Sequence, residues 1–415
     1  MRRTTRLALS LSLSLSLPLS LWSACTDDTP TGLADLGTTA PGDLAGSPDA
    51  GGPRPTLVVA GSDFTTGSLS TIELPGLAVQ KNVDTVDKQP VVRAFGSKVY
   101  VLDQTRGALR TYDVGARGFQ SPVDSPVSKT PEVAGAQANP HDLFVDVPRN
   151  VAYVTLYGAF GSTAVTGQTA LGVIDLSQPQ QGIKSFIQVS VAGLDTDNNP
   201  DADRLIGCGD YLYVLLQNID RNKGYKPAGG GTIMRVNLVG TMQTRYIPLT
   251  GQNPVSMAIL ADCSEALVGS AGDQLSGALT GMSGVERVDL KAATSSGLAL
   301  TDIQLGGNVS ALDAADPTRV FVDVSVKGAM AGSYNNTVYV VDAVAKSKGA
   351  ALLGPMSYVA GVRVLSDQLV VLSAGAPGAG QLKTGVFLGP ANGQPLPTTP
   401  LEVGLPPQSV ALVSR

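Results

Sequence analysis

The chain contains a single histidine, His141, and an acid, Asp142, follows it directly. An imidazole beside a carboxylate can transfer protons near neutral pH, and a second acid, Asp203, lies near the start of a later apolar segment. Together the three residues could serve a hydrolase or a lactonase. The alternative, which we favour, is that they are hydrogen-bonded residues of a channel wall. One imidazole also excludes a histidine-rich zinc site.

A run of side-chain oxygens ends at Asp203. Its members stand at alternating positions: Asp195, Asp197, Asn199, Asp201 and Asp203. Loops that wrap Ca²⁺ use this spacing, because alternate residues direct their oxygens at one hard cation. The run resembles a thrombospondin type 3 calcium repeat without its central glycine. A calcium-stabilised adhesion module is therefore one hypothesis, and a solvated acidic loop is the other.

Four asparagines precede the first strand of successive repeating units: Asn139, Asn199, Asn253 and Asn308. Three of them are followed by proline. Side by side at the mouth of a channel, their amides could line a site for a small ligand or a cation. Asparagine before proline is also a common turn initiator, whose amide caps the backbone. We favour the turn interpretation.

Two cysteines, Cys208 and Cys263, occupy matching places in neighbouring units, in the turn between the first two strands. An oxidising compartment would allow them to form a disulfide. They could equally be two separate buried thiols, since the sequence does not give their Cα separation.

The amino terminus has the features of an export signal. Residues 1–24 begin with three arginines and continue with an apolar segment, 7–21, that is too short to span a bilayer. The residues up to Cys25 resemble the lipobox of bacterial lipoproteins, although Trp22 stands where that family usually has leucine. The resemblance implies lipidation at Cys25. Ordinary cleavage after Ala24 would instead leave a soluble periplasmic or secreted protein.

A flexible spacer follows the predicted lipid. Residues 25–55 are rich in Gly, Pro and Asp and have no apolar period, so they predict a disordered tether. Thr26 rather than aspartate follows Cys25, which under the enteric sorting rule favours the outer over the inner membrane. The whole chain has a formal charge of −5, and losing the signal's arginines would make it more acidic. Such a chain lacks the basic surface that nucleic-acid binding needs.

The candidate residues are positioned by a repeat that covers residues 56–415. Copies begin at Pro90, Pro140, Pro200, Pro254 and Pro407, about 53 residues apart on average. Each copy contains a strand, a tight turn, a strand, a variable loop and a strand. These are the first three strands of a four-stranded antiparallel blade. The last copy has one strand and the domain opens without an inner strand. We therefore predict an all-β, seven-bladed β-propeller whose C-terminal strand completes the N-terminal blade.

The units resemble the YVTN family of bacterial β-propeller repeats. The resemblance rests on AYVTLYG at 152–158, LGVIDLS at 171–177 and VYVVD at 338–342. It implies the seven-bladed fold, and members of the family serve as surface, scaffold and accessory modules. Fold analogy does not determine a function.

The long connections of the predicted propeller fall on one face. They are residues 158–169, 218–231, 270–284 and 327–336 between second and third strands, and 121–139 between two blades. Variable loops gathered on one end of a rigid scaffold are typical of binding proteins. We expect an envelope lipoprotein, held to the membrane through Cys25, that acts as a binding or scaffold module for a protein, glycan or small ligand. Tolerated surface insertions are the alternative.

Overall fold

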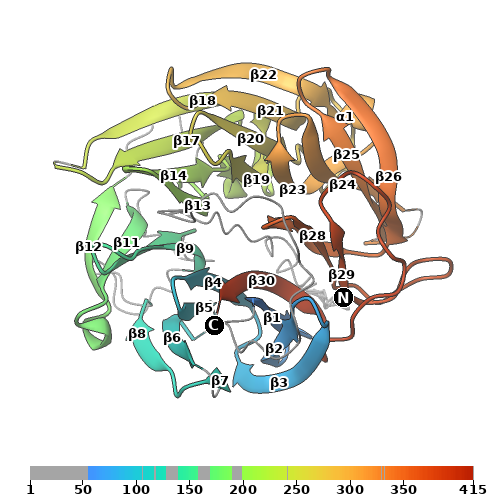
Figure 1. Cartoon of the computed structure of the whole chain (residues 1–415). Helices are drawn as coiled ribbons and strands as arrows, with labels where there is room; N and C mark the ends of the chain where they lie inside the picture. Colours follow the sequence, from blue (N-terminus) through green and yellow to red (C-terminus); the bar gives the residue numbers. More distant parts are fainter. Residues whose placement is uncertain are drawn as a thin grey trace, which may run out of the picture.

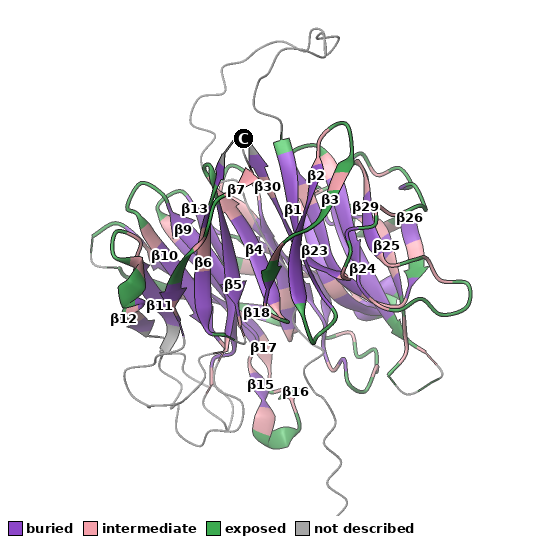
Figure 2. Cartoon of the chain, turned by 90° about the horizontal axis from the view of Figure 1, so that it is seen from below, coloured by how far each residue is buried: buried purple, intermediate pink, exposed green. Residues whose placement is uncertain are grey.

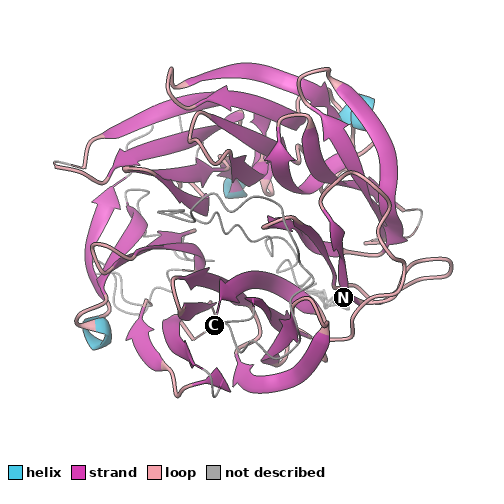
Figure 3. Cartoon of the chain, in the orientation of Figure 1, coloured by secondary structure: helices cyan, strands magenta, loops and turns pink. Residues whose placement is uncertain are grey.

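The computed structural model describes residues 55–104, 106–115, 118–127, 139–157, 169–188, 199–240, 242–328, 330 and 332–414. Antiparallel sheets are arranged radially around a central axis (Figure 1), and strands dominate the described residues (Figure 3). The predicted all-β, seven-bladed propeller is confirmed. The predicted signal peptide and Cys25 lie outside the described residues.

The strands of each blade are given in order from the one nearest the axis to the outermost one. Blade 1 consists of β30 (Pro407–Ser414), β1 (Pro55–Ser62), β2 (Gly67–Glu73) and β3 (Ala78–Val86). Blade 2 consists of β4 (Pro90–Phe95), β5 (Lys98–Asp103), β6 (Ala108–Gly115) and, beside β6, β7 (Gly118–Phe119) and β8 (Val123–Pro126). Blade 3 consists of β9 (Pro140–Asp146), β10 (Val151–Leu156), β11 (Thr169–Asp175) and β12 (Ile183–Gln188). Blade 4 consists of β13 (Ala202–Cys208), β14 (Tyr211–Leu216), β17 (Gly230–Asn237) and β18 (Thr244–Gln252).

The remaining blades continue the ring in chain order. Blade 5 consists of β19 (Pro254–Ile259), β20 (Glu265–Ser270), β21 (Gly284–Asp289) and β22 (Thr294–Thr301). Blade 6 consists of β23 (Asn308–Asp316), β24 (Arg319–Lys327), β25 (Tyr334–Asp342) and β26 (Ser347–Met356). Blade 7 consists of β27 (Val359–Leu365), β28 (Gln368–Ser373) and β29 (Gly385–Pro390).

Short elements lie in the connections. They are a two-stranded hairpin of β15 (Ile219–Asp220) and β16 (Lys226–Pro227), the 3₁₀ helices η1 (Pro179–Gln181) and η2 (Arg221–Lys223), and the helix α1 (Asp302–Leu305). Among the described residues, no helix has the length and apolar character needed to cross a membrane.

The ring closes by pairing the two ends of the described chain. β30 lies antiparallel to β1, from Pro55 opposite Ser414 to Gly61 opposite Pro407. The C-terminal strand thus supplies the inner strand of blade 1, as the repeat predicts. Closure matters because an open ring would leave the backbone edge of β1 without a partner.

The apolar core is divided into seven layers, one between each pair of consecutive blades. The cluster between blades 1 and 2, for example, packs Val58 and Leu69 against Val99 and Tyr112. Equivalent clusters fill the other six interfaces. Because second strands such as β10 and β14 are covered on both faces, their residues are almost continuously apolar.

Two details of the repeat differ from the prediction. The inner strand of blade 4 begins at Ala202 rather than at Pro200. Blade 7 has three strands, and the place of its fourth is reduced to one bridge between Val386 and Leu401. Residues 391–401 contain three prolines, which cannot donate backbone hydrogen bonds to a ladder. Leu396 nevertheless packs into the core between blades 6 and 7.

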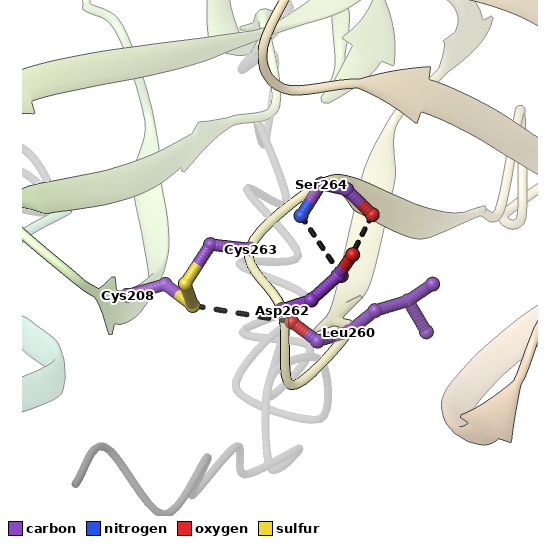
Figure 4. The surroundings of a disulfide bond; sticks show 5 residues. All are labelled: Cys208, Leu260, Asp262, Cys263 and Ser264. Atoms are coloured by element: carbon purple, nitrogen blue, oxygen red, sulfur yellow. Dashed lines mark hydrogen bonds between the residues drawn. A yellow bond between two sulfur atoms is a disulfide. The ribbon is translucent and has the colours of Figure 1, made fainter.

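Cys208 and Cys263 form a disulfide, the pairing that the sequence left open (Figure 4). Their Cα atoms are 5.7 Å apart. Cys208 ends β13 and Cys263 lies in the turn between β19 and β20, so the bond joins blades 4 and 5 at their short-turn ends. It therefore reinforces the interface of blades 4 and 5 at the apolar layer to which Cys208 belongs and against which Cys263 packs.

We predict that replacing both cysteines, Cys208→Ser with Cys263→Ser, lowers the free energy of unfolding by up to about 4 kcal/mol, because the bond closes a loop of 55 residues in the unfolded chain. Denaturant titration measures this loss. Ser264→Ala, in the same turn, is the matched control. If the double variant and the control unfold at the same denaturant concentration, the disulfide does not stabilise the ring.

Candidate functional site

An irregularity recurs where the inner strand of each blade begins. In six of the seven blades the inner strand carries one more residue than its partner, so the register shifts by one. Only the pairing of β4 with β5 is continuous. The extra residues lie at His141–Asp142, Asp203–Arg204, Val255, Ser310, Ala360 and Gln408. A bulge redirects side chains that would otherwise alternate regularly.

The bulges of blades 3 and 4 bring His141 and Asp203 together. Nδ1 of His141 lies 3.0 Å from Oδ1 of Asp203, and both side chains are buried. The other carboxylate oxygen of Asp203 accepts a hydrogen bond of 2.8 Å from Nε2 of Gln217. Two of the three residues that the sequence proposed for catalysis are therefore direct neighbours.

Tyr157 covers the imidazole. Its ring is stacked on His141 with centroids 4.0 Å apart and planes 6° from parallel. Its hydroxyl donates to Oε1 of Gln217 at 2.7 Å, which connects it back to Asp203. Arg221, from η2, lies over the same tyrosine ring and donates to the backbone oxygen of Tyr157 and to Asp201. The histidine is thus part of a dense polar cluster between two blades.

This cluster favours a neutral imidazole beside an ionised carboxylate. Burial lowers the pKa of His141, although the hydrogen bond and the charge of Asp203 oppose that effect. Burial alone would raise the pKa of Asp203, but the charge of Arg204 and the contact with His141 bring it below its usual value. The imidazole is 5% exposed, so it is poorly placed to exchange protons with a substrate in solution.

Asp142 points away from His141 into a separate interaction. Its Oδ1 lies 2.6 Å from Nη2 of Arg93 in blade 2, and both side chains are fully buried. Its Oδ2 accepts a hydrogen bond of 2.9 Å from the backbone of Leu205 in blade 4. Asp142 therefore connects three consecutive inner strands and does not orient the imidazole, as a catalytic pair would require.

Buried arginines on inner strands are the feature that sequence reasoning missed. Arg93, Arg204 and Arg363 are among the largest fully buried side chains. Arg204 lies 3.6 Å from Asp203 and donates to the backbone of Val255 in blade 5. Arg363 lies 3.5 Å from Asp313 of blade 6. An arginine inside an otherwise apolar strand was the available signal, because a buried guanidinium needs a partner.

The four asparagines do not form one ring of equivalent residues. Asn139 and Asn253 have positive φ angles of 42° and 50°, directly before the inner strand. In blade 4 that place belongs to Asp201, with a φ of 48°, while Asn199 lies two residues earlier and donates to Tyr157 and Asp201. Asn308 is already part of β23, opposite Ser325. Their backbone geometry agrees with turn residues at Asn139 and Asn253.

The described part of the predicted calcium run is engaged by protein groups. Asp195 and Asp197 lie outside the described residues. Asp201 binds Arg221 and the backbone of Ile219, and Asp203 binds His141 and Gln217. Within the part of the chain that the structure describes, no three His, Cys, Asp or Glu residues are grouped as metal ligands would be. Calcium at this run remains an untested prediction.

The β15–β16 hairpin, part of the connection 218–231, extends beyond the blades at the end of the molecule opposite the C-terminus (Figure 2), the face that the sequence predicts for the long connections. On this face, blades 5 and 6 carry exposed apolar side chains. We call them the apolar patch: Leu275, Leu279, Met282, Ile303, Val326 and Met330. Met330 is 75% and Ile303 60% exposed. Rigid clusters of this kind mark interaction surfaces on soluble proteins.

Two polar side chains hold the apolar patch in place. Asp302 is fully buried, and its carboxylate accepts hydrogen bonds from the backbone of Thr280 and Gly281 at 2.9 and 2.8 Å. Lys327 donates to the backbone oxygens of Leu275 and Ser276 at 3.0 and 3.3 Å. Residues 270–284, α1 and the end of β24 are therefore joined into one ordered surface.

No protein-family model matches this chain, and a search of the curated proteins finds no match. The chain is similar in structure to a candidate 6-phosphogluconolactonase from Bacteroides fragilis, with a TM-score of 0.57, 11% identity, and 89% of this chain and 100% of that chain covered. It also matches a functionally unknown protein from Desulfotomaculum acetoxidans, with a TM-score of 0.49, 9% identity, and 86% and 99% covered. These likenesses show the fold alone.

We predict that His141 makes stability depend on pH. Its folded pKa lies below the unfolded value of about 6.5, so the unfolded state binds more protons and stability falls as the pH drops through that range. In His141→Gln this contribution is absent. The stability gap between wild type and variant should therefore narrow as the pH falls from 7.5 to 5.5, as measured by urea titration.

Tyr157→Phe is the control for this prediction, because it removes a hydroxyl from the same cluster and leaves the imidazole. Its stability should follow the wild-type pH dependence. A gap between wild type and His141→Gln that stays constant with pH would mean that His141 titrates as it does in the unfolded chain.

Proposed function

We propose that this chain is a lipid-anchored protein of the bacterial envelope, of the YVTN propeller type, whose long-connection face binds a protein partner. The apolar patch on blades 5 and 6 carries the proposal. Leu279 and Ile303 expose apolar surface from segments that hydrogen bonds of Asp302 and Lys327 hold in place, and Met330 exposes more from the connection between β24 and β25. A pre-organised apolar surface reduces the entropy lost on association, which favours a protein partner over a small polar ligand.

The position of the tether supports this orientation. The first described residue, Pro55, pairs with Ser414 beside the C-terminus, on the face of the short turns (Figure 2). A chain anchored at Cys25 would therefore approach the propeller from that face. The long-connection face, and with it the apolar patch, would then point away from the anchoring membrane.

The disulfide between Cys208 and Cys263 supports export. Structural disulfides persist in the periplasm and outside the cell, whereas the cytosol keeps thiols reduced. This agrees with the signal peptide that residues 1–24 predict. The residue after the acceptor, Thr26, favours the outer membrane.

A structural role in a binding protein explains the polar cluster around His141 better than a catalytic role in a hydrolase does. His141 is buried, stacked on Tyr157 and hydrogen-bonded to Asp203. Asp142 is committed to Arg93. These residues therefore act best as supports between blades, leaving recognition to the loops.

We predict that a photo-crosslinking residue at position 279, 303 or 330 captures the same partner in intact cells. The three positions share one surface and should give adducts of one mass on a denaturing gel. Val147 and Val344, exposed apolar residues in short turns on the opposite face, are the matched controls and should not give that adduct. Adducts that form equally from both faces would contradict the proposed binding surface.

We predict that Cys25→Ser moves the protein from the membrane fraction to the soluble fraction, because stable anchoring requires the acyl chains. Metabolic labelling with a palmitate analogue should mark the wild type and not the variant. Ser23→Ala, two residues earlier, should leave both readouts unchanged. Labelled, membrane-bound Cys25→Ser would refute lipidation at this residue.

A further inference from the structure

Asp323 differs from three other buried acids of the propeller, which lie beside arginines. Asp142, Asp203 and Asp313 each lie within 3.6 Å of an arginine. Asp323, in β24, is fully buried, and the described residues include no cation in a salt bridge with it. Its Oδ2 accepts a hydrogen bond from the Ser310 hydroxyl, while its Oδ1 has no hydrogen-bond partner among the described residues.

Asn308, also on blade 6, has a buried side-chain oxygen without a hydrogen-bond partner among the described residues, and it faces blade 7 as Asp323 does. Along β24, Phe321 belongs to the apolar layer between blades 6 and 7, so Asp323 and Ser325, on the same face of the strand, also point toward blade 7. Asn308 stands opposite Ser325 in the ladder, and its buried oxygen is Oδ1.

Blade 7 supplies two further oxygens from the opposite side. On β28, Val371 packs into the same layer, so Ser373 also points toward blade 6. Ser357 lies in the connection between the blades, and its backbone oxygen accepts a hydrogen bond of 2.9 Å from Asn336. The hydroxyl oxygens of Ser357 and Ser373 are buried without partners among the described residues. Ser373 lies opposite Val359, the first residue of β27, and Ser325 lies opposite Asn308, the first residue of β23, so both serines lie near the end of the blades where the inner strands begin.

We propose that a monovalent cation binds between blades 6 and 7, held by Asp323 and by neutral oxygens of Asn308, Ser357 and Ser373. All four donors are oxygens, which hard cations prefer. One carboxylate balances one positive charge, whereas a divalent ion would leave an uncompensated charge in an apolar layer. The ion compensates the charge of Asp323, as arginines compensate the charges of Asp142, Asp203 and Asp313.

The cost of burying Asp323 makes such an ion useful. Burial raises the pKa of this carboxyl to about 7, although the Ser310 hydroxyl opposes the shift. Above that pH the ionised form must be compensated inside the protein. Two charged groups on the inner strands of blades 6 and 7, Asp313 and Arg363, already compensate each other. A bound cation would offset the desolvation of Asp323 and tie blade 7, with its three strands, to blade 6.

The test compares thermal unfolding of the full chain at pH 8 in 150 mM sodium, potassium or N-methylglucamine chloride. We expect sodium or potassium to raise the Tm by about 3 °C or more over the large organic cation, because an ion that binds only the folded state stabilises it. The difference should disappear in Asp323→Asn. It should also disappear at pH 5, where the wild-type carboxyl is protonated.

Asp367→Asn, an exposed acid of blade 7, is the matched control and should keep the full response to the inorganic cations. An equal Tm in all three salts, or a response that persists in Asp323→Asn, would overturn the proposal. A crystal grown with rubidium should give an anomalous peak within about 3 Å of the Asp323 carboxylate. Electron density without anomalous signal at that place would indicate a buried water instead.

Discussion

The propeller depends on apolar layers that no blade can form by itself. Each blade buries both faces against its neighbours, and all seven core clusters lie between blades. The layers exist only if the ring is complete, and the pairing of β30 with β1 completes it. This closure fixes the spacing of the inner strands and gathers the variable connections at one end.

The ring of inner strands creates a second requirement. Polar groups there are withdrawn from water, so they need partners inside the protein. The repeated bulge turns side chains such as His141, Asp203 and Ser310 out of regular alternation. Most of these groups find partners on an adjacent blade. Asp142 bridges from Arg93 to Leu205 across three blades, and Arg204 reaches blade 5 through Val255. Buried pairs of this kind add little net stability but oppose misregistration, since a shifted blade would leave charges uncompensated.

The two faces of the ring consequently have different roles. The face of the short turns carries the two ends of the described chain and the disulfide, which are constraints on assembly. The opposite face carries the long connections, and there the fold is free to vary without disturbing the apolar layers. Asp302 shows how such a loop becomes an ordered surface: one buried carboxylate satisfies several loop amides and leaves apolar side chains exposed.

The sequence by itself determined the class of fold, the number of blades and the closing strand, because these follow from strand periodicity and the spacing of the repeat, which are local properties of the chain. It also brought forward Cys208 and Cys263 as a possible pair. It could not show that His141 meets Asp203 while Asp142 turns to Arg93, nor that Asp201 rather than Asn199 directly precedes blade 4's inner strand. Those outcomes depend on one-residue register shifts and on contacts between blades about 50 residues apart in sequence. Only the tertiary structure decides them, because a bulge reverses which side chains face each other without changing any residue.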